Sequence, residues 1–179
     1  MMEAQKILDF WYHELTPVQW FKVDPALDQI IKNKFLETLE SANRGEIAHW
    51  RSSAFGRLAE IIVLDQFPRN IFRGTSLAFA YDNVALVLSQ ELVLQGLDLK
   101  IPVDRLAFAY MPFMHSESAL IHIEAMRLFS AKGLEDNYEY EVEHKRIIDL
   151  FGRYPHRNAA LGRHSTPDEL EFLKTHKGF

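Results

Sequence analysis

The chain has 179 residues, of which 47% are hydrophobic, 12% aromatic and 25% charged, so it is long and apolar enough to bury the core of one folded domain. This composition excludes a disordered tail and collagen- or mucin-like repeats, and the absence of cysteine excludes disulfides, cysteine-ligated metal and a cysteine nucleophile. The net charge of −5, from 20 basic and 25 acidic residues, argues against nucleic acid as a partner.

Along the chain, apolar residues repeat with the period of an amphipathic α-helix, and proline, glycine or capping residues separate the segments. In chain order, the eight predicted helices cover about residues 7–15, 25–44, 53–66, 75–95, 102–112, 116–132, 138–151 and 167 onward. Asp24 is the predicted N-cap of the second helix, and Thr166 with Glu169 forms a capping box for the last. Pro112 is expected to end or kink the fifth helix, and Gly152 to close the seventh.

No segment shows the alternation of a β-strand, since the β-branched residues 61–64 lie within a helical stripe. The predicted fold class is therefore all-α, an antiparallel array of about eight helices in a single domain over residues 1–179. The first ten residues lack the unbroken apolar run of a signal peptide, and Pro112 interrupts the longest apolar stretch, 106–114. We expect a soluble chain without a membrane partner, located in the cytoplasm by elimination.

Two predicted helix exits resemble each other. The third helix leaves through residues 64–70, LDQFPRN, and the seventh through residues 151–158, FGRYPHRN. Both contain an aromatic residue, proline, arginine and asparagine, with glycine and a further arginine nearby. If these shared residues serve one site, the two exits lie near each other in the fold.

The arginines of these exits are the candidate ligand-binding residues, because guanidinium groups bind carboxylate and phosphate in a bidentate manner. The predicted ligand-binding residues are Arg69, Asn70, Arg73, Arg153, Arg157, Asn158 and Arg163. The structural alternative is that these arginines satisfy helix C-terminal carbonyls and pair with carboxylates elsewhere.

Other short stretches, together with these exits, resemble a known family. They are residues 8–12 (LDFWY), 20–21 (WF), 64–73 (LDQFPRNIFR), 110–112 (YMP), 115–117 (HSE), 151–158, 161–163 (LGR) and 165–167 (STP). Over essentially its whole length the chain is similar to the bacterial proteins grouped as domain of unknown function 924. The resemblance implies an all-helical fold related to tetratricopeptide repeats and supplies no activity. After His-Ser-Glu the family usually continues with acidic and amide residues, whereas this chain has residues 118–124, SALIHIE.

Histidines near these stretches are the candidate catalytic residues. His115 lies two residues from Glu117 after a proline break, a pairing suited to acid–base chemistry, although Ser116 or Ser118 capping a helix explains the segment as well. His144 lies on the inward face of its predicted helix, where a satisfied core histidine is the alternative. His156 completes the predicted catalytic set. The spacing does not match a zinc protease, and neither a phosphate-binding glycine loop nor a serine-hydrolase motif is present.

Two functions therefore remain open from the sequence. One is a binding protein for a small anionic molecule or an acidic peptide, held by the arginines. The other is an enzyme that uses His115, Glu117, His144 and His156 on an anionic substrate. Neither a metal nor a cofactor is predicted, and no oligomeric state follows from the sequence.

Overall fold

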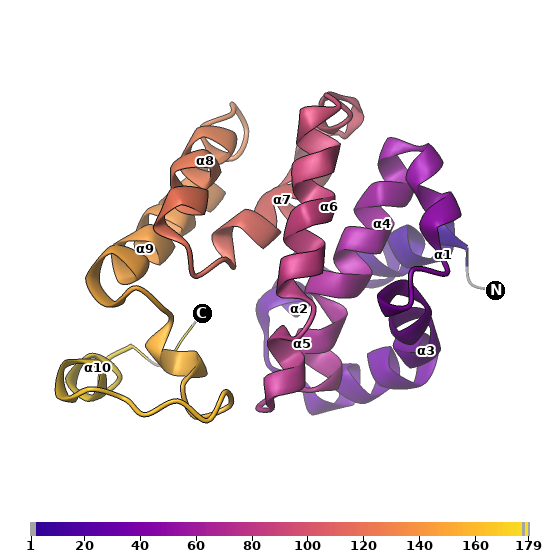
Figure 1. Cartoon of the computed structure of the whole chain (residues 1–179). Helices are drawn as coiled ribbons and strands as arrows, with labels where there is room; N and C mark the ends of the chain where they lie inside the picture. Colours follow the sequence, from indigo (N-terminus) through magenta and orange to yellow (C-terminus); the bar gives the residue numbers. More distant parts are fainter. Residues whose placement is uncertain (1–2, 177, 179) are drawn as a thin grey trace.

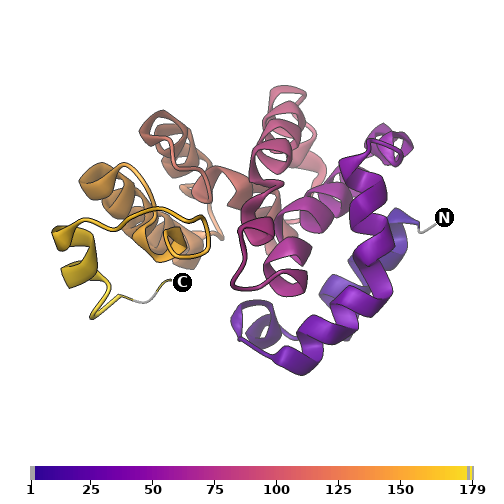
Figure 2. The same cartoon turned by 60° about the horizontal axis from the view of Figure 1, so that its bottom comes forward.

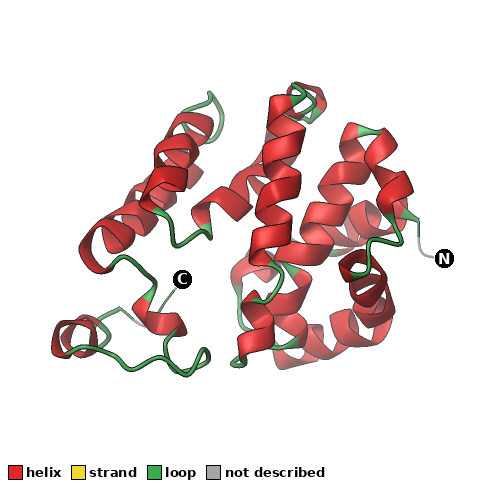
Figure 3. Cartoon of the chain, viewed as in Figure 1, coloured by secondary structure: helices red, strands yellow, loops and turns green. Residues whose placement is uncertain are grey.

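The structure, a computed structural model, describes residues 3–176 and 178, and all regular elements within them are helical. Figure 3 shows helices and loops throughout this part of the chain. The predicted all-α class is confirmed, and each of the eight predicted segments contains an α-helix. The tetratricopeptide-like arrangement and the single domain stay predictions.

The α-helices follow one another through short connections. In chain order they are α1 (Ala4–Asp9), α2 (Pro17–Phe21), α3 (Pro25–Asn43), α4 (Ala54–Asp65), α5 (Phe67–Ile71), α6 (Asp82–Leu94), α7 (Val103–Met114), α8 (Ala119–Phe129), α9 (Glu135–Phe151) and α10 (Pro167–Phe172). A π-helical segment covers Phe10–Glu14, and short 3₁₀ helices cover Ala48–Ser52, Ser76–Phe79, Asp98–Lys100 and Pro155–Arg157.

Three predicted helix ends have the expected local chemistry. The Asp24 carboxylate accepts two backbone N–H groups of the first turn of α3, at 2.9 and 3.2 Å. Thr166 and Glu169 form the reciprocal capping box of α10, with N···O distances of 3.2 and 2.7 Å. Gly152 ends α9 at φ 68°, in the left-handed region where a glycine has no side-chain penalty. These ends fix where the loops around the site begin.

Two predicted helix starts differ from the structure. The fourth helix is predicted to open at Thr75 or Ser76; a short 3₁₀ helix does begin at Ser76, but the α-helix α6 begins only at Asp82. An aspartate in that first turn is favoured by the positive end of the helix. The sixth was expected from residue 116, but α8 begins at Ala119, because the Ser116 hydroxyl accepts the Ser118 N–H at 3.2 Å in the preceding turn.

Pro112 does not end its helix, since α7 continues through Met114. Proline has no N–H to donate to the carbonyl four residues earlier, so one helical hydrogen bond is lost. The side chains of 107–114 are all buried, and their packing outweighs that loss. The continuation carries the end of α7, with the following His115, into the middle of the molecule.

Helix α4 lies at the centre of the main hydrophobic core. Its side chains from Leu58 to Asp65 are buried, and it packs against α1, α3, α6 and α7 (Figure 1). A second, much smaller cluster consists of Ile147, Ile148 and Tyr154, with Phe151 and Phe172 packed against it. Figure 2 shows α9 and α10 on the side of the molecule opposite α1 and α3, while α8 contributes side chains to the main core.

One segment of the described chain, Ser76–Leu94, is long and apolar enough to cross a membrane by length and composition alone. A single segment of this kind is weak evidence, because core helices of soluble proteins have the same properties. The cytoplasmic location stays a prediction.

Candidate functional site

A cavity of about 640 Å³ lies between α9 on one side and α2 and α5 on the other, with the end of α7 between them. Figure 1 shows α9 across the gap from α2 and α5. The 3₁₀ helices Ser76–Phe79 and Pro155–Arg157 complete the lining. The lining includes these predicted site residues: Arg69, Asn70, Arg73, His115, His144, His156 and Arg157.

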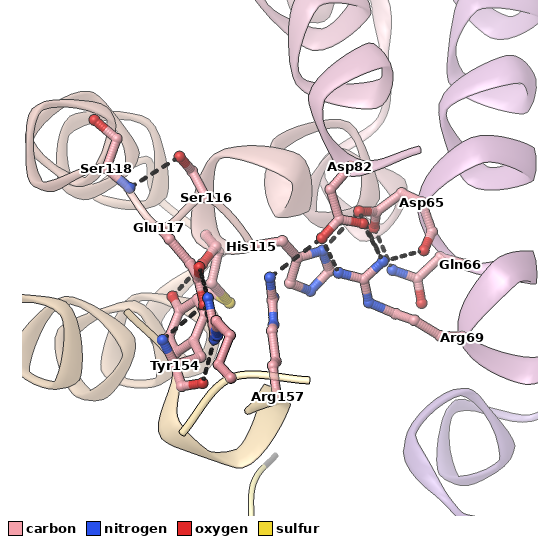
Figure 4. A network of polar contacts seen from close by, with 12 residues as sticks. Asp65, Gln66, Arg69, Asp82, His115, Ser116, Glu117, Ser118, Tyr154 and Arg157 are labelled. Carbon is pink, nitrogen blue, oxygen red and sulfur yellow. Dashed lines mark hydrogen bonds and ion pairs between the residues drawn. The ribbon is translucent and has the colours of Figure 1, made fainter. Parts of the chain in front are cut away.

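Asp82, in the first turn of α6, joins the two arginine-containing exits. Its oxygens accept from Nη1 and Nη2 of Arg69 at 2.7 and 2.9 Å, and from Nη1 of Arg157 at 3.3 Å (Figure 4). The expected proximity of the exits is therefore confirmed. Arg69 also donates to the backbone carbonyl of Asp65 at 2.6 Å, so the structural alternative for this arginine holds as well.

Arg157 is the most enclosed cation of the cavity, with 6% of the residue exposed. Its guanidinium lies over the rings of Phe79 and Tyr154, with ring centroids at 4.7 and 4.5 Å. Within the described part of the chain, its buried Nε has no hydrogen-bond partner. Burial and the neighbouring Arg69 lower the pKa of Arg157, which shows that Asp82 offsets its charge only in part.

Asp65 and His115 form a hydrogen-bonded pair at the inner end of the cavity. The Asp65 side chain is 1% exposed, and His115 Nδ1 lies 2.7 Å from its Oδ1 (Figure 4). Gln66 donates to the other oxygen at 2.6 Å. Burial raises the pKa of Asp65, but His115 and Arg69 outweigh burial and hold that pKa at about 2.

His115 itself is neutral at pH 7, because burial and Arg69 lower its pKa. The ionised Asp65 then fixes the proton on Nδ1 of His115. The second ring nitrogen, Nε2, keeps its lone pair, and the structure gives it no hydrogen bond within residues 3–176 and 178. His115 thus has the protonation state of a general base in the cavity lining.

Two further imidazoles line the cavity around Tyr154. The rings of His144 and His156 lie 5.7 and 5.5 Å from the Tyr154 ring, between centroids. Burial lowers the pKa of His144 to about 3 and, with the nearby Arg157, that of His156 to about 4. His144 Nδ1 also lies 2.7 Å from the Tyr140 carbonyl, so the structural alternative is met in part. Both histidines therefore line the cavity as neutral groups at pH 7.

Asn70 and Arg73 share a carboxylate at the edge of the cavity. Arg73 donates to both oxygens of Asp28 at 2.7 and 2.9 Å, and Asn70 donates to one of them at 2.8 Å. These contacts tie α5 and the following turn to α3. Because the Arg73 side chain is 38% exposed, solvent weakens its ion pair with Asp28.

The other predicted site residues form a second network beside the cavity: Glu117, Arg153, Asn158 and Arg163. Arg163 donates to both oxygens of Glu117 at 2.6 and 2.9 Å and to Asn158 Oδ1 at 2.9 Å. Arg153 binds both oxygens of Glu169 at 2.6 and 2.8 Å. These arginines pair with carboxylates, as the structural alternative expected, and Glu117 also accepts the backbone N–H of Tyr154 at 2.8 Å.

Within residues 3–176 and 178, no three histidine, aspartate or glutamate side chains lie together in a way that could hold a metal ion. The polar groups that line the cavity are guanidinium, imidazole, amide and phenol groups, with the ammonium of Lys22 and the carboxylate of Asp136.

A family match and one solved structure relate the chain to known proteins. Residues 7–177 match the family described as bacterial protein of unknown function (DUF924). The chain belongs to this family. Among solved structures, the protein of unknown function ATU0120 from Agrobacterium tumefaciens is similar at 35% identity and a TM-score of 0.88, over 97% of each chain. No curated protein matches.

One fully buried histidine of this DUF924 protein, His122, is not among the predicted site residues. His122 Nδ1 lies 2.6 Å from Oε1 of Glu141, and its Nε2 lies 2.8 Å from the Ser116 carbonyl and 3.2 Å from the Tyr154 hydroxyl. Burial raises the pKa of Glu141. The pair joins α8 to α9 and contacts the Tyr154 side chain, which lines the cavity. Its signal in the sequence was the histidine at the point where the chain departs from the usual family residues.

Proposed function

We propose that the protein binds a small anionic molecule in the cavity, with Arg69 and Arg157 as the main cationic contacts. The observation that carries the proposal is the incomplete pairing of Arg157. Arg157 shares the Asp82 carboxylate with Arg69, and the buried Nε of Arg157 has no hydrogen-bond partner in the described residues. A bound oxyanion would give the two guanidiniums that share Asp82 a further acceptor.

The charges of the lining support the same proposal. Lys22, Arg69, Arg73 and Arg157 line the cavity, whereas Asp136 is the carboxylate among its described lining residues. The two carboxylates that contact Arg69, those of Asp65 and Asp82, do not line the cavity themselves. The charged side chains that line the cavity are therefore mainly cationic.

A small molecule fits this site better than an acidic peptide. The volume of about 640 Å³ lies within the ~300–1,000 Å³ of small-molecule sites. A peptide in extended form needs a long open groove or a free sheet edge, and the residues that the structure describes contain no sheet. We therefore favour a free carboxylate or phosphate compound as the ligand.

Isothermal titration calorimetry with acetate, phosphate and sulfate tests the proposal. We expect at least one of these anions to bind, and Arg157→Met to weaken that binding at least tenfold. Arg146→Met is the matched control, because Arg146 is an exposed arginine of α9 paired with Glu143. The proposal is refuted if none of the anions binds the parent protein, or if both variants bind as the parent does.

The Asp65–His115 pair supports a second candidate function, an enzyme acting on the same ligand. A buried aspartate that fixes the tautomer of a histidine is the arrangement by which hydrolases prepare a general base. Glu117 has no part in this candidate, because Arg163 and the Tyr154 N–H occupy its oxygens. His144 and His156 line the cavity as further neutral imidazoles.

Chemical conversion separates the enzyme from the binding protein. Compounds that bind by calorimetry are incubated with the protein and followed by NMR. An enzyme converts at least one of them, and His115→Gln abolishes the conversion while leaving the Kd within about threefold. Unchanged compounds after prolonged incubation at pH 7 would instead leave binding as the function.

A further inference from the structure

We infer that the anionic ligand carries an aromatic ring, bound beside the guanidinium groups by the aromatic and methionine side chains of the cavity. This inference rests on the proposed function, because it places the ring on the same molecule that Arg69 and Arg157 bind. The chemical class is therefore an aryl carboxylate or an aryl phosphate.

The apolar part of the lining is unusually rich in rings and thioethers. Two of the aromatic residues come from α2, the others from three further places in the chain, and the methionines from the end of α7: Trp20, Phe21, Phe79, Tyr140, Tyr154, Met111 and Met114. Ring edges and methionine sulfur both interact favourably with aromatic faces, whereas a purely aliphatic ligand gains only the burial of its surface.

Two of these rings are exposed to solvent although they belong to the cavity. Phe21, at the end of α2, is 66% exposed, and Tyr140, on α9, is 60% exposed. They lie on elements that face the cavity from opposite sides (Figure 1). A ligand ring that packs against either side chain would remove apolar surface from water.

The planar guanidinium of Arg157 limits how such a ligand is oriented. Its central carbon lies 4.7 and 4.5 Å from the ring centroids of Phe79 and Tyr154, and its N–H groups point outward in the guanidinium plane. A carboxylate or phosphate bound at that edge directs the rest of the molecule away from Arg157. The remaining lining contains Trp20, Phe21 and the methionines, so the ring of the ligand would meet them.

Calorimetry of the full chain with matched probes tests the inference. The probes are acetate, cyclohexanecarboxylate and benzoate, together with inorganic phosphate and phenyl phosphate. An aromatic contact beyond simple burial is worth roughly two- to tenfold in affinity. We therefore expect benzoate to bind at least threefold tighter than cyclohexanecarboxylate, and phenyl phosphate at least tenfold tighter than phosphate.

Two exposed-ring variants locate the effect. Phe21→Ala and Tyr140→Ala should each reduce the affinity for benzoate at least threefold and leave that for acetate within twofold. Both side chains are largely exposed, so the variants are expected to fold. Phe55→Ala is the matched control, because Phe55 is a partly exposed phenylalanine of α4 that does not belong to this lining.

The outcomes separate this inference from the proposed function. If acetate or phosphate binds but cyclohexanecarboxylate matches benzoate, the ring is not recognised and the inference fails while anion binding stands. If the exposed-ring variants bind benzoate as the parent does, the inference also fails. If none of the five probes binds, both the inference and the proposed function are overturned.

Discussion

Replacing Asp82 with asparagine removes the charge that two cavity arginines share. The parent carboxylate accepts two hydrogen bonds from Arg69 and one from Arg157, and its side chain is 13% exposed. Removing one partner of a buried ion pair costs ~3–5 kcal/mol, and the partial exposure of Asp82 and Arg69 reduces this. We therefore expect Asp82→Asn to lower the free energy of unfolding by about 3 kcal/mol, which for a chain of this size lowers the Tm by ~6–12 °C.

Asp28→Asn is the matched control for this prediction. Asp28 also binds an arginine through two hydrogen bonds, but its partner Arg73 is much more exposed than Arg69. An exposed pair contributes ~0.2–1 kcal/mol, so the control should lose far less stability. Urea unfolding followed by circular dichroism gives both values.

A bound anion should restore part of the loss in Asp82→Asn, because it supplies negative charge to the same guanidiniums. At a concentration of one hundred times its Kd, a ligand specific for the folded state adds ~2.7 kcal/mol. The stabilising role of the Asp82 ion pairs is refuted if Asp82→Asn and Asp28→Asn lower the free energy of unfolding equally, or if Asp82→Asn lowers it by less than ~0.5 kcal/mol.

Further predictions concern pH and backbone strain. His144 and His156 have pKa values of about 3 and 4, below the ~6.5 of histidine in an unfolded chain. Protons therefore bind the unfolded state preferentially. The free energy of unfolding should be highest above pH 6.5 and fall as the pH decreases toward 4. His144→Gln should flatten this slope in unfolding measured from pH 7 to pH 4. Asp65, with a pKa of about 2, contributes stability that is present above pH 4 and lost as the pH falls toward 2, and Asp65→Asn should remove that loss. Gly152→Ala should cost ~1 kcal/mol through its positive φ alone, since an added methyl group would meet open space; a thermal melt equal to that of the parent would contradict this.

The sequence predicted the helices well because their signals are local. The capping residues Asp24 and Thr166 and the terminal Gly152 act within one turn of their own position, and the structure confirms all three. Pro112 is the instructive exception. Its local effect is to break a helix, and only the burial of the side chains around it, which depends on distant segments, explains why α7 continues.

The candidate site was predicted less completely, because carboxylates decide which arginines face the cavity. The sequence grouped Arg69 and Arg157 with Arg153 and Arg163, since all four lie in similar loops. Only tertiary packing shows that two of them share Asp82 while the others have their own acidic partners. Asp65 lies in the helix exit LDQFPRN, yet nothing in its neighbours indicates a pairing with His115, fifty positions along the chain.

The small cluster of Ile147, Ile148 and Tyr154 has a consequence for how tightly the C-terminal part of the chain is held. So few apolar side chains give limited cohesion, and the contacts of Arg157 with Asp82 and of Tyr154 with the Met114 carbonyl do much of the attachment. A ligand that bridges Arg69 of α5 and Arg157 would fasten these distant segments together. Amide hydrogens of residues 153–165 should then exchange more slowly when the cavity is filled, while those of α3 exchange at an unchanged rate, so that occupancy of the site is recorded as reduced local opening of the fold.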